Sequence, residues 1–444
     1  MSGRGHDREI WRLAIPAFLA LVAEPLFLLS DAAIVGHLGT PELAGLGIAA
    51  VVLQTAVGLC VFLAYGTTAS VARYLGAGDR ARALAQGIDG VWLAVIIGVV
   101  VTVAGVALTD PLVAAFGAGD DVSEQATTYL RIAFLGTTPL LVMLATTGVL
   151  RGLQDTRTPL VVAVAGNALN VVLNLLLVYG VGGFEGFGIA GSAVGSVLAQ
   201  VASAAALLAV VVQAARREGA SLRPDLPGIR SAARAAVALV IRTLTLRAAL
   251  LVTTYAVAVG ATGGEGAVDL AAHQLAVTIW SFLAFTLDAI AIAAQAITGR
   301  YLGAGDVETT REVTRRMVWW GVVSGLGTGV LLAAASPWLG ALFTGDADVH
   351  DRLVPVLLVA ALGQPVAGVV FVLDGVLIGA GDGTYLAWAG TVVLVVYAPL
   401  VLAAAWAGGG LVWIWVIFTG VFMGARFVAL VGRARSDRWL VTGT

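Results

Sequence analysis

The heptapeptide Arg73–Asp79 reads RYLGAGD, and the same seven letters stand again at Arg300–Asp306, 227 residues further along the chain. Other pairs keep this offset without a gap over more than 110 residues: Glu42–Ala44 with Asp269–Ala271, Gly148–Leu150 with Gly375–Leu377, and Asp155 with Asp382. Chance similarity between apolar segments would not keep its register for so long. The chain is therefore two copies of one structural unit.

The composition shows where these copies fold. Apolar residues make up 59% of the 444 residues and charged residues 12%, whereas a soluble domain carries about 25% charged residues. The mean hydropathy is +0.96. Stretches near the roughly 20 apolar residues that a spanning helix needs recur throughout, for example Val91–Leu108, Leu160–Tyr179, Val197–Ala214 and Val318–Ala335. We therefore expect an integral membrane protein, whose first apolar stretch is a retained helix rather than a signal peptide.

Polar or glycine-rich breaks divide the chain into apolar segments. They fall near 37–41, 76–86, 109–122, 152–158, 180–187, 216–230, 260–268, 303–312, 339–351, 379–384 and 406–410. Eleven breaks predict twelve helices. All 25 basic residues are arginine, and 21 of them lie at the two termini or at even-numbered breaks. Because basic residues mark the cytoplasmic side, both termini are expected in the cytoplasm.

The predicted fold is an all-α polytopic membrane protein with two pseudo-symmetric six-helix bundles. We expect an N-terminal bundle over 1–215, a cytoplasmic linker over 216–234 and a C-terminal bundle over 235–444. Both copies start on the same side, so they are parallel repeats. Transporters built this way often bind substrate between the halves and rock one half against the other.

Charged groups inside the membrane indicate function, because a charge at the bilayer centre costs at least about 2.5–3.5 kcal/mol. Glu24 and Asp31 are seven residues apart and share one face of the first helix. Pro16 and Pro25 in the same helix each remove a backbone hydrogen bond, which predicts a hinge. We predict a cation or proton site here. The alternative is a buried carboxyl satisfied by neighbouring backbone or hydroxyl groups.

The fifth and sixth helices add polar groups. Asn167, Asn170 and Asn174 lie on one face of the fifth, and Ser192 and Ser196 lie one turn apart on the sixth. Amide and hydroxyl oxygens suit a hard cation. They also join helices inside membranes, so both roles remain open.

The second copy has carboxylates of its own. Asp374 aligns with Thr147, so the copies have diverged there, and Asp288 lies in the eighth helix. We consider both as second-bundle candidates for function, the alternative being an ion pair. Arg242 in the seventh helix is expected to snorkel or to pair with a carboxylate. His273 is expected to be packed and hydrogen-bonded.

Other classes of protein find little support. No Walker motif, His-Glu-x-x-His pair or nucleophile elbow appears, which argues against an ATP-driven pump and against an enzyme. The single Cys60 excludes an internal disulfide and makes a cysteine metal site implausible. The net charge of −2 gives no indication of nucleic-acid binding. We expect no cofactor.

Several motifs resemble the MATE (multidrug and toxin extrusion) family, and its DinF-like branch in particular. They are Ile15–Ala17, Asp31–Gly39, Arg73–Gly78, Leu150–Thr156, Ala272–Gln274 and Leu373–Leu377. The resemblance implies a V-shaped antiporter of two six-helix bundles, which exports cationic and amphipathic drugs as H⁺ or Na⁺ enters. It also implies that Asp31 is the coupling carboxylate, that Ser196 holds a hydroxyl position of the site, and that Asp374 matches a functional acid of some members.

The family's fifth helix carries an asparagine and, four residues later, an aspartate. This chain has Asn170 and Asn174 there, so the second acid is missing. Fewer carboxylates offset less of the cost of dehydrating Na⁺, which favours proton coupling. A Na⁺ site at Asp31, Asn170 and Asn174 remains the alternative, and Glu24 could supply the missing acid.

We therefore expect a secondary active antiporter that exports cationic or amphipathic drugs, toxins or metabolites in exchange for H⁺ or Na⁺. The alternative is a lipid-linked oligosaccharide flippase of the same broad superfamily. In either case the expected partners of this protein are a small organic substrate and the lipid bilayer, and we expect no nucleic acid. We expect a monomer in the inner (plasma) membrane.

Overall fold

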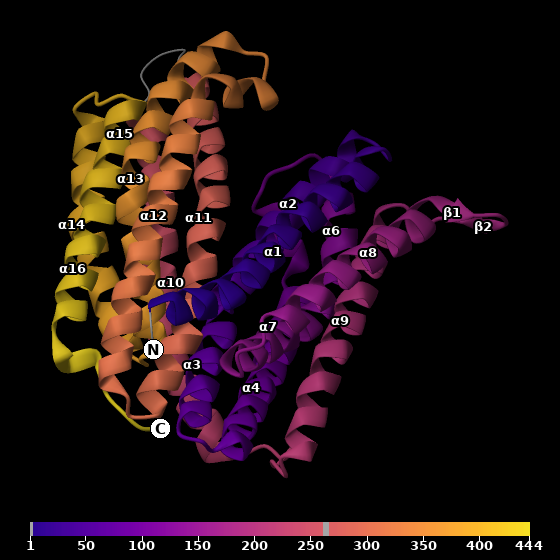
Figure 1. Cartoon of the computed structure of the whole chain (residues 1–444). Coiled ribbons are helices and arrows are strands. Elements are labelled where there is room, and N and C mark those ends of the chain that lie inside the picture. The colour runs from indigo at the N-terminus through magenta and orange to yellow at the C-terminus, as the bar shows by residue number, and fades with distance from the viewer. Residues whose placement is uncertain (1–2, 261–265) are drawn as a thin grey trace. The chain divides into compact units, whose positions relative to one another are not determined.

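The computed structural model describes residues 3–260 and 266–444 (Figure 1). Within these residues, twelve helical segments are long and apolar enough to cross a membrane, which confirms the predicted all-α architecture. The predicted break at 260–268 falls mostly on residues 261–265, which lie outside the described part of the chain. The protein is a multi-pass membrane protein.

The first half of the chain supplies six spanning segments. Its elements are α1 (Gly3–Gly36), α2 (Thr40–Leu59), α3 (Phe62–Gly76), α4 (Arg80–Ala107), α5 (Thr109–Ala114), α6 (Asp120–Ala133), a 3₁₀ turn (Phe134–Gly136), α7 (Thr137–Gly152), α8 (Arg157–Tyr179), a two-residue hairpin β1 (Gly180–Val181) and β2 (Phe184–Glu185), and α9 (Ile189–Arg217). Helices α2 and α3 together form one spanning segment, as do α6 and α7.

The second half supplies the other six. Its elements are α10 (Leu226–Gly260), α11 (Gly266–Gly303), α12 (Val307–Leu339), a 3₁₀ turn (Gly340–Leu342), α13 (Ala347–Gly379), α14 (Gly383–Trp406), α15 (Leu411–Ile417), a π-helical turn (Phe418–Met423), α16 (Gly424–Arg435) and a 3₁₀ turn (Asp437–Trp439). Helices α15 and α16 form the last spanning segment.

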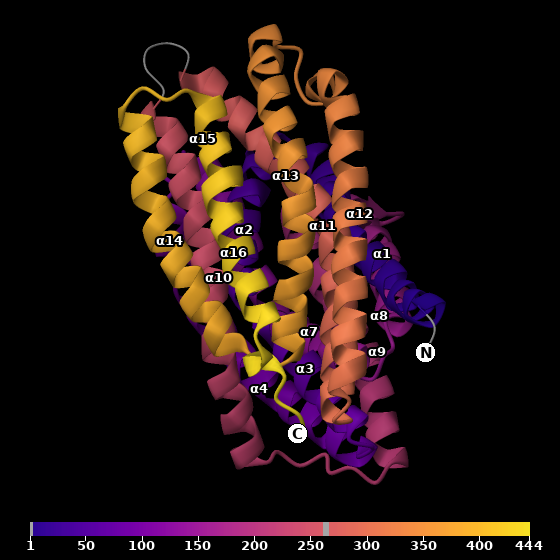
Figure 2. The same ribbon diagram turned by 60° about the vertical axis from the view of Figure 1, so that its left-hand side comes forward.

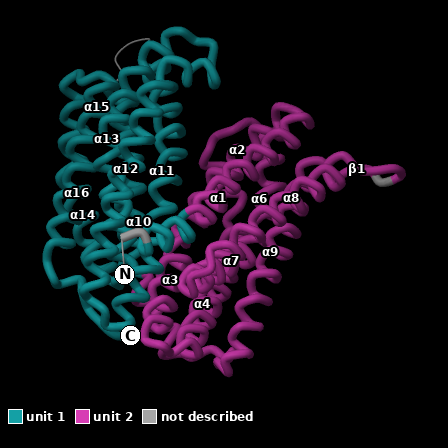
Figure 3. Tube along the Cα trace, in the orientation of Figure 1, with its two compact units in different colours: residues 1–14, 237–443 teal, residues 15–236, 444 magenta. Residues whose placement is uncertain are grey.

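The chain divides into two compact units (Figure 3). The N-terminal unit holds residues 15–236 and Thr444, and the C-terminal unit holds residues 3–14 together with 237–443. The connection between α9 and α10 is non-helical only over residues 218–225, because the rest of the predicted linker 216–234 ends α9 or begins α10.

The repeated heptapeptide ends one helix and starts the next. Gly78 has a φ of +81°, and the backbone N–H of Asp79 donates to the carbonyl of Tyr74 at 3.1 Å, which closes the end of α3. The Asp79 carboxylate then accepts the backbone N–H three residues later at 2.9 Å and caps α4. Gly305 and Asp306 repeat this turn between α11 and α12. Both motifs thus form tight turns at the breaks predicted near 76–86 and 303–312.

Glycines let helices of the C-terminal unit approach closely. Helix α12 carries Gly321, Gly325 and Gly329 at a spacing of four, on the face that meets α13 (Figure 2). A Cβ atom at Gly325 would lie only 2.4 Å from the carbonyl oxygen of Gln364. Small residues at this spacing join helices inside membranes, where no hydrophobic effect drives them together.

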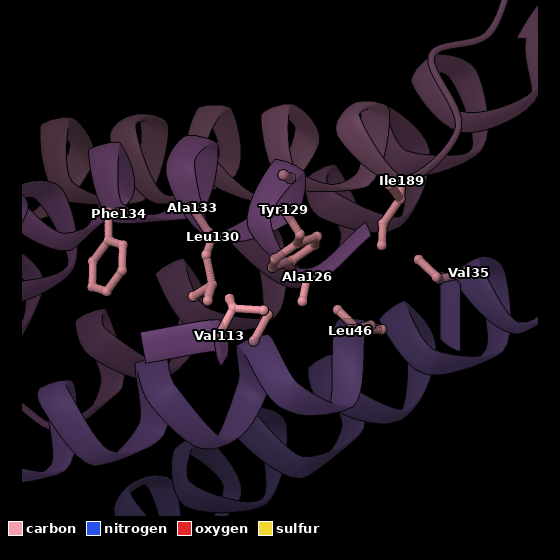
Figure 4. Close-up of a cluster of buried hydrophobic side chains, with 11 residues drawn as sticks. Val35, Leu46, Val113, Ala126, Tyr129, Leu130, Ala133, Phe134 and Ile189 are labelled. Carbon is pink, nitrogen blue, oxygen red and sulfur yellow. The ribbon is translucent and has the colours of Figure 1, made fainter. Parts of the chain in front are cut away.

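In the N-terminal unit, a buried apolar cluster holds α6 against its neighbours (Figure 4). It contains Leu130 and Phe134, which are almost fully buried, together with Leu46 from α2 and Ile189 from α9. Tyr129 belongs to the same cluster. The apolar packing therefore fixes the helix that presents the Tyr129 hydroxyl.

Candidate functional site

Asp31 lies inside the N-terminal unit with only 3% of its surface exposed. Three uncharged side chains donate hydrogen bonds to its carboxylate. The Asn174 amide donates to Oδ1, and Oδ2 accepts the Ser196 hydroxyl at 3.3 Å and the Tyr129 hydroxyl at 3.4 Å. The site therefore draws on four helices, α1, α6, α8 and α9.

A second layer supports these donors. The Asn170 amide donates to the Ser196 hydroxyl at 3.0 Å, and its own oxygen accepts the Asn174 amide at 3.3 Å. Both asparagines are completely buried, as their spacing of four on α8 allows. The structure thus brings Asp31, Asn170, Asn174 and Ser196 together.

Two buried oxygens in this site lack a hydrogen-bond partner among the described residues: Asn174 Oδ1 and Ser192 Oγ. The Ser192 hydroxyl lies one turn before Ser196, beside Tyr129 but without a well-formed hydrogen bond. Gly195 makes room for the first of these oxygens, because a Cβ atom there would come within 2.1 Å of it. Buried polar atoms normally have partners, so this site has unused capacity to bind.

The Asp31 carboxylate has no positively charged partner among the described residues. No ion pair to Asp31 occurs in the described part of the chain, and its hydrogen-bond partners are all neutral. No group of three or more His, Cys, Asp or Glu residues within 3–260 and 266–444 could hold a metal ion. Asp31 is therefore the one carboxylate of this hydrogen-bonded cluster, and no ion pair within the described residues balances it.

Other predicted residues of α1 lie outside this cluster. The Glu24 side chain is exposed, and no hydrogen bond to it occurs among the described residues. The Asn167 amide donates to the backbone carbonyl of Ala23 at 2.7 Å, which is a helix-joining contact. Pro16 and Pro25 both lie inside the continuous helix α1. Asn167 thus supports the backbone next to Pro25, where a helix is weakened by the missing donor.

The C-terminal unit has a different buried cluster, centred on Asp374. The Arg242 Nε donates to Asp374 Oδ1 at 3.1 Å, and a terminal nitrogen of Arg242 bonds the other oxygen. Arg426 lies 3.7 Å from the same carboxylate and also interacts electrostatically with Asp288. The exposed fractions of Asp374, Arg426 and Arg242 are 7%, 11% and 13%. Arg242 therefore pairs with a carboxylate, one of its two predicted fates.

Sequence reasoning missed two residues of these clusters. Tyr129 carried no signal, because one tyrosine in an apolar segment resembles any packing residue. Arg426 was counted with the arginines at the cytoplasmic C-terminus, and the structure corrects this: it lies inside the last spanning segment. Its position within the apolar run that starts at Leu411 could have revealed it.

His273 is packed as predicted. The Trp415 indole donates to its Nδ1 at 3.2 Å, so the proton of the neutral ring is on Nε2, which donates to the Thr254 hydroxyl at 2.9 Å. The exposed fraction of His273 is 1%. Both ring nitrogens are satisfied, as expected for a structural histidine.

Comparison with known proteins identifies the family. The family model MatE matches residues 16–176 and 244–402, one segment in each copy. The chain is 31% identical to Protein DETOXIFICATION 44, chloroplastic, from Arabidopsis thaliana, with 97% of this chain and 83% of the relative covered. It is 28% identical to DNA damage-inducible protein F from Escherichia coli (strain K12), with 96% and 91% covered.

A solved structure agrees with this result. The Vibrio cholerae MATE transporter VcmN in the bent form superposes with a TM-score of 0.85 at 20% identity and covers 99% of both chains, which supports the fold. The resemblance drawn from the motifs is confirmed. Because the family model covers most of the chain in both copies, this protein belongs to the MatE family of multi-pass membrane transporters.

Proposed function

We propose that this transporter exports cationic or amphipathic organic molecules in exchange for protons, by alternating access. It is not proposed to use a cofactor or to act as an enzyme. The observation that carries the proposal is the buried Asp31 carboxylate, surrounded by neutral groups on four helices. A membrane carboxylate without a countercharge is costly unless it binds a proton or cation, which is the exchange that an antiporter needs.

The orientation of the Asn174 amide disfavours Na⁺ at this carboxylate. Asn174, Ser196 and Tyr129 all direct donors towards Asp31. A sodium ion needs oxygen lone pairs directed at it, and the Asn174 N–H that points at Asp31 does not supply one, although the two hydroxyl oxygens do. Besides the Asp31 carboxylate and the hydroxyl oxygens, the unpartnered oxygens of Asn174 and Ser192 are the features of this cluster, among the described residues, that would help a cation.

We further propose that the chain works as a monomer in a plasma membrane, with both termini in the cytoplasm. Arginines concentrate at the termini and at the even-numbered breaks, which favours cytoplasmic termini. The relatives described above carry no flippase name, so the oligosaccharide flippase gains no support. Glu24 and Asp288 are given no role in the exchange, because no hydrogen bond to Glu24 occurs among the described residues and Asp288 interacts with Arg426 of its own unit.

The test is ion-dependent efflux of a cationic dye from proteoliposomes, driven separately by a pH gradient and by a Na⁺ gradient. We expect the pH gradient to drive efflux and the Na⁺ gradient to fail. Asp31→Asn should abolish pH-driven efflux, while Asp121→Asn, the same change at an exposed position at the start of α6, should not. Parental efflux by folded Asp31→Asn protein would contradict the assignment.

The coupling ion can be tested further at Asn174. Asn174→Asp restores the acid that the family pattern has at this position and places a second carboxylate next to Asp31. Two adjacent carboxylates resist double ionisation, and a cation relieves that repulsion. We expect this variant to gain Na⁺-driven efflux. If the parent already uses Na⁺ and the variant does not change the ion, the donor-based argument is wrong.

A further inference from the structure

The first helix of each copy begins in the unit formed mainly by the other copy (Figure 3). Helix α1 is continuous, yet its residues 3–14 group with the C-terminal unit and the rest with the N-terminal unit. Helix α10 does the reverse, because its residues 226–236 group with the N-terminal unit. The chain therefore passes between the units twice, each time inside an unbroken helix.

The start of α1 is held to α12 by a charged contact. Two nitrogens of the Arg316 guanidinium donate to the two carboxylate oxygens of Asp7, both at 2.6 Å. The Trp320 indole donates to the same carboxylate at 2.7 Å. The Trp11 ring meets Trp320 edge-on with 5.0 Å between centroids. A bidentate guanidinium–carboxylate pair fixes both distance and orientation.

A second contact holds the same segment to α11. The Arg300 guanidinium bonds Glu9, and the Tyr301 hydroxyl donates to the other carboxylate oxygen at 3.1 Å. In the same segment, Ile10 and Leu13 are almost fully buried. We call this set the N-terminal latch: Asp7, Glu9 and Trp11 with Arg300, Tyr301, Arg316 and Trp320.

The start of α10 is held to α4 in the N-terminal unit. Asp89, which is 5% exposed, accepts the backbone N–H of Asp225 at 3.0 Å. Gly228 allows this approach, because a Cβ atom there would lie 2.2 Å from the Asp89 carboxylate. The Trp92 indole donates to the carbonyl of Leu222 at 3.2 Å. We call these five residues the linker latch.

The two latches occupy equivalent positions of the duplication. The offset of 227 residues that aligns the heptapeptides places Asp89 on Arg316. Both residues lie on the third spanning segment of their copy, α4 and α12. Each holds the first helix of the other copy, although one is an acid that accepts a backbone N–H and the other is a base that grips a carboxylate. The two contacts therefore share their position on the third spanning segment but differ in their chemistry.

We propose that the two latches keep both helix starts attached to their units throughout transport, so that the conformational change is taken up within α1 and α10. The N-terminal latch is then required for transport, although it contains no residue of the Asp31 site. The transport part of this inference rests on the proposed function. The attachment itself does not, and it is tested separately.

Exchanging the charges of Asp7 and Arg316 tests whether transport requires the N-terminal latch. Asp7→Arg and Arg316→Asp each bring like charges together, and we expect each to lower dye efflux roughly tenfold. The double variant restores a pair of opposite charges, and efflux should return to within about twofold of the parent. Arg315→Asp is the matched control, because Arg315 is the exposed neighbour of Arg316, and it should leave efflux unchanged. Parental efflux by a folded single variant would overturn the proposal.

A distance measurement on the otherwise unaltered latch needs no transport. With Cys60 replaced by serine, spin labels at Arg8→Cys and Arg315→Cys report the separation of α1 and α12 from two exposed positions. We expect one narrow distance distribution, unchanged by pH or by added substrate. A shift or a second population would show that the segment detaches and would refute the inference. Failure of the proposed antiport would leave this result standing.

Discussion

Removing Arg242 tests whether Asp374 is a fixed counter-ion or an exchanging acid. In the structure, Arg242 makes two hydrogen bonds to Asp374, and both side chains are largely buried. Removing one partner of a buried ion pair costs about 3–5 kcal/mol, because the other charge is left without compensation. Arg426 remains 3.7 Å from the carboxylate, so we expect Arg242→Met to cost about 3 kcal/mol, the lower end of that range.

The assay is thermal unfolding of the purified protein in detergent, followed by tryptophan fluorescence. For a domain of about 200 residues, 1 kcal/mol corresponds to roughly 2–4 °C, so Arg242→Met should melt about 6–12 °C below the parent. The double variant Arg242→Met with Asp374→Asn removes both charges and should recover at least half of the loss. A melting temperature of Arg242→Met within about 2 °C of the parent would refute the ion-pair reasoning.

Transport provides the second readout at Asp374. If this residue is a permanent counter-ion, the double variant keeps pH-driven efflux, in contrast to Asp31→Asn. The two aspartates are thereby distinguished by function rather than by stability. Loss of pH-driven efflux in Asp374→Asn at an unchanged melting temperature would instead identify Asp374 as a coupling acid.

Two further predictions concern Gly195, beside the Asp31 cluster, and Asp306, which caps α12. Gly195→Ala should strongly reduce pH-driven efflux with little loss of expression, because the added methyl group displaces the Asn174 amide from Asp31. Unchanged efflux would show that this amide is dispensable. Asp306→Ala should lower stability by about 1 kcal/mol at neutral pH through loss of the cap on α12. The hydrogen bonds from Thr309 hold the pKa of Asp306 below its usual value, so this contribution exists above about pH 4 and disappears as pH falls through the folded-state pKa. Melting curves of parent and variant should therefore converge in acid, and a constant difference would contradict the cap assignment.

The fold was predictable because the bilayer imposes strong rules on sequence. A helix that satisfies its own backbone must show a long apolar stretch, and breaks between stretches must show polar or turn-forming residues. The heptapeptide at Arg73–Asp79 shows both effects, since its leucine and glycines end one helix and its aspartate caps the next. The breaks within spanning segments, such as the one between α2 and α3 at Cys60, gave no comparable signal because they remain apolar.

The residues of the candidate site were predictable only where a charged or amide side chain stands in an otherwise apolar membrane helix. A carboxylate such as Asp31 and a row of asparagines on one helix face stand out against apolar neighbours. Tyr129 does not, since its hydroxyl is one polar atom on an otherwise apolar side chain. The latches were also invisible, because Asp7 and Glu9 near a terminus read as solvated charges. Only the three-dimensional structure pairs them with Arg316 and Arg300.

The duplication explains why the two buried acids differ. By the same offset, Asn170 and Asn174 of α8 correspond to Tyr397 and Val401 of α14, where Tyr397 bonds Thr253 at 2.6 Å. The second copy has therefore replaced the amide face by an aromatic and an aliphatic residue.

Asp374 of the second copy faces guanidinium groups, whereas Asp31 faces only neutral donors. The guanidinium groups carry permanent positive charge, so the charge of Asp374 is balanced within its unit, whereas no ion pair balances Asp31 among the described residues. Under the proposed function, ion exchange therefore belongs to the first copy, and the second copy is its charge-balanced partner.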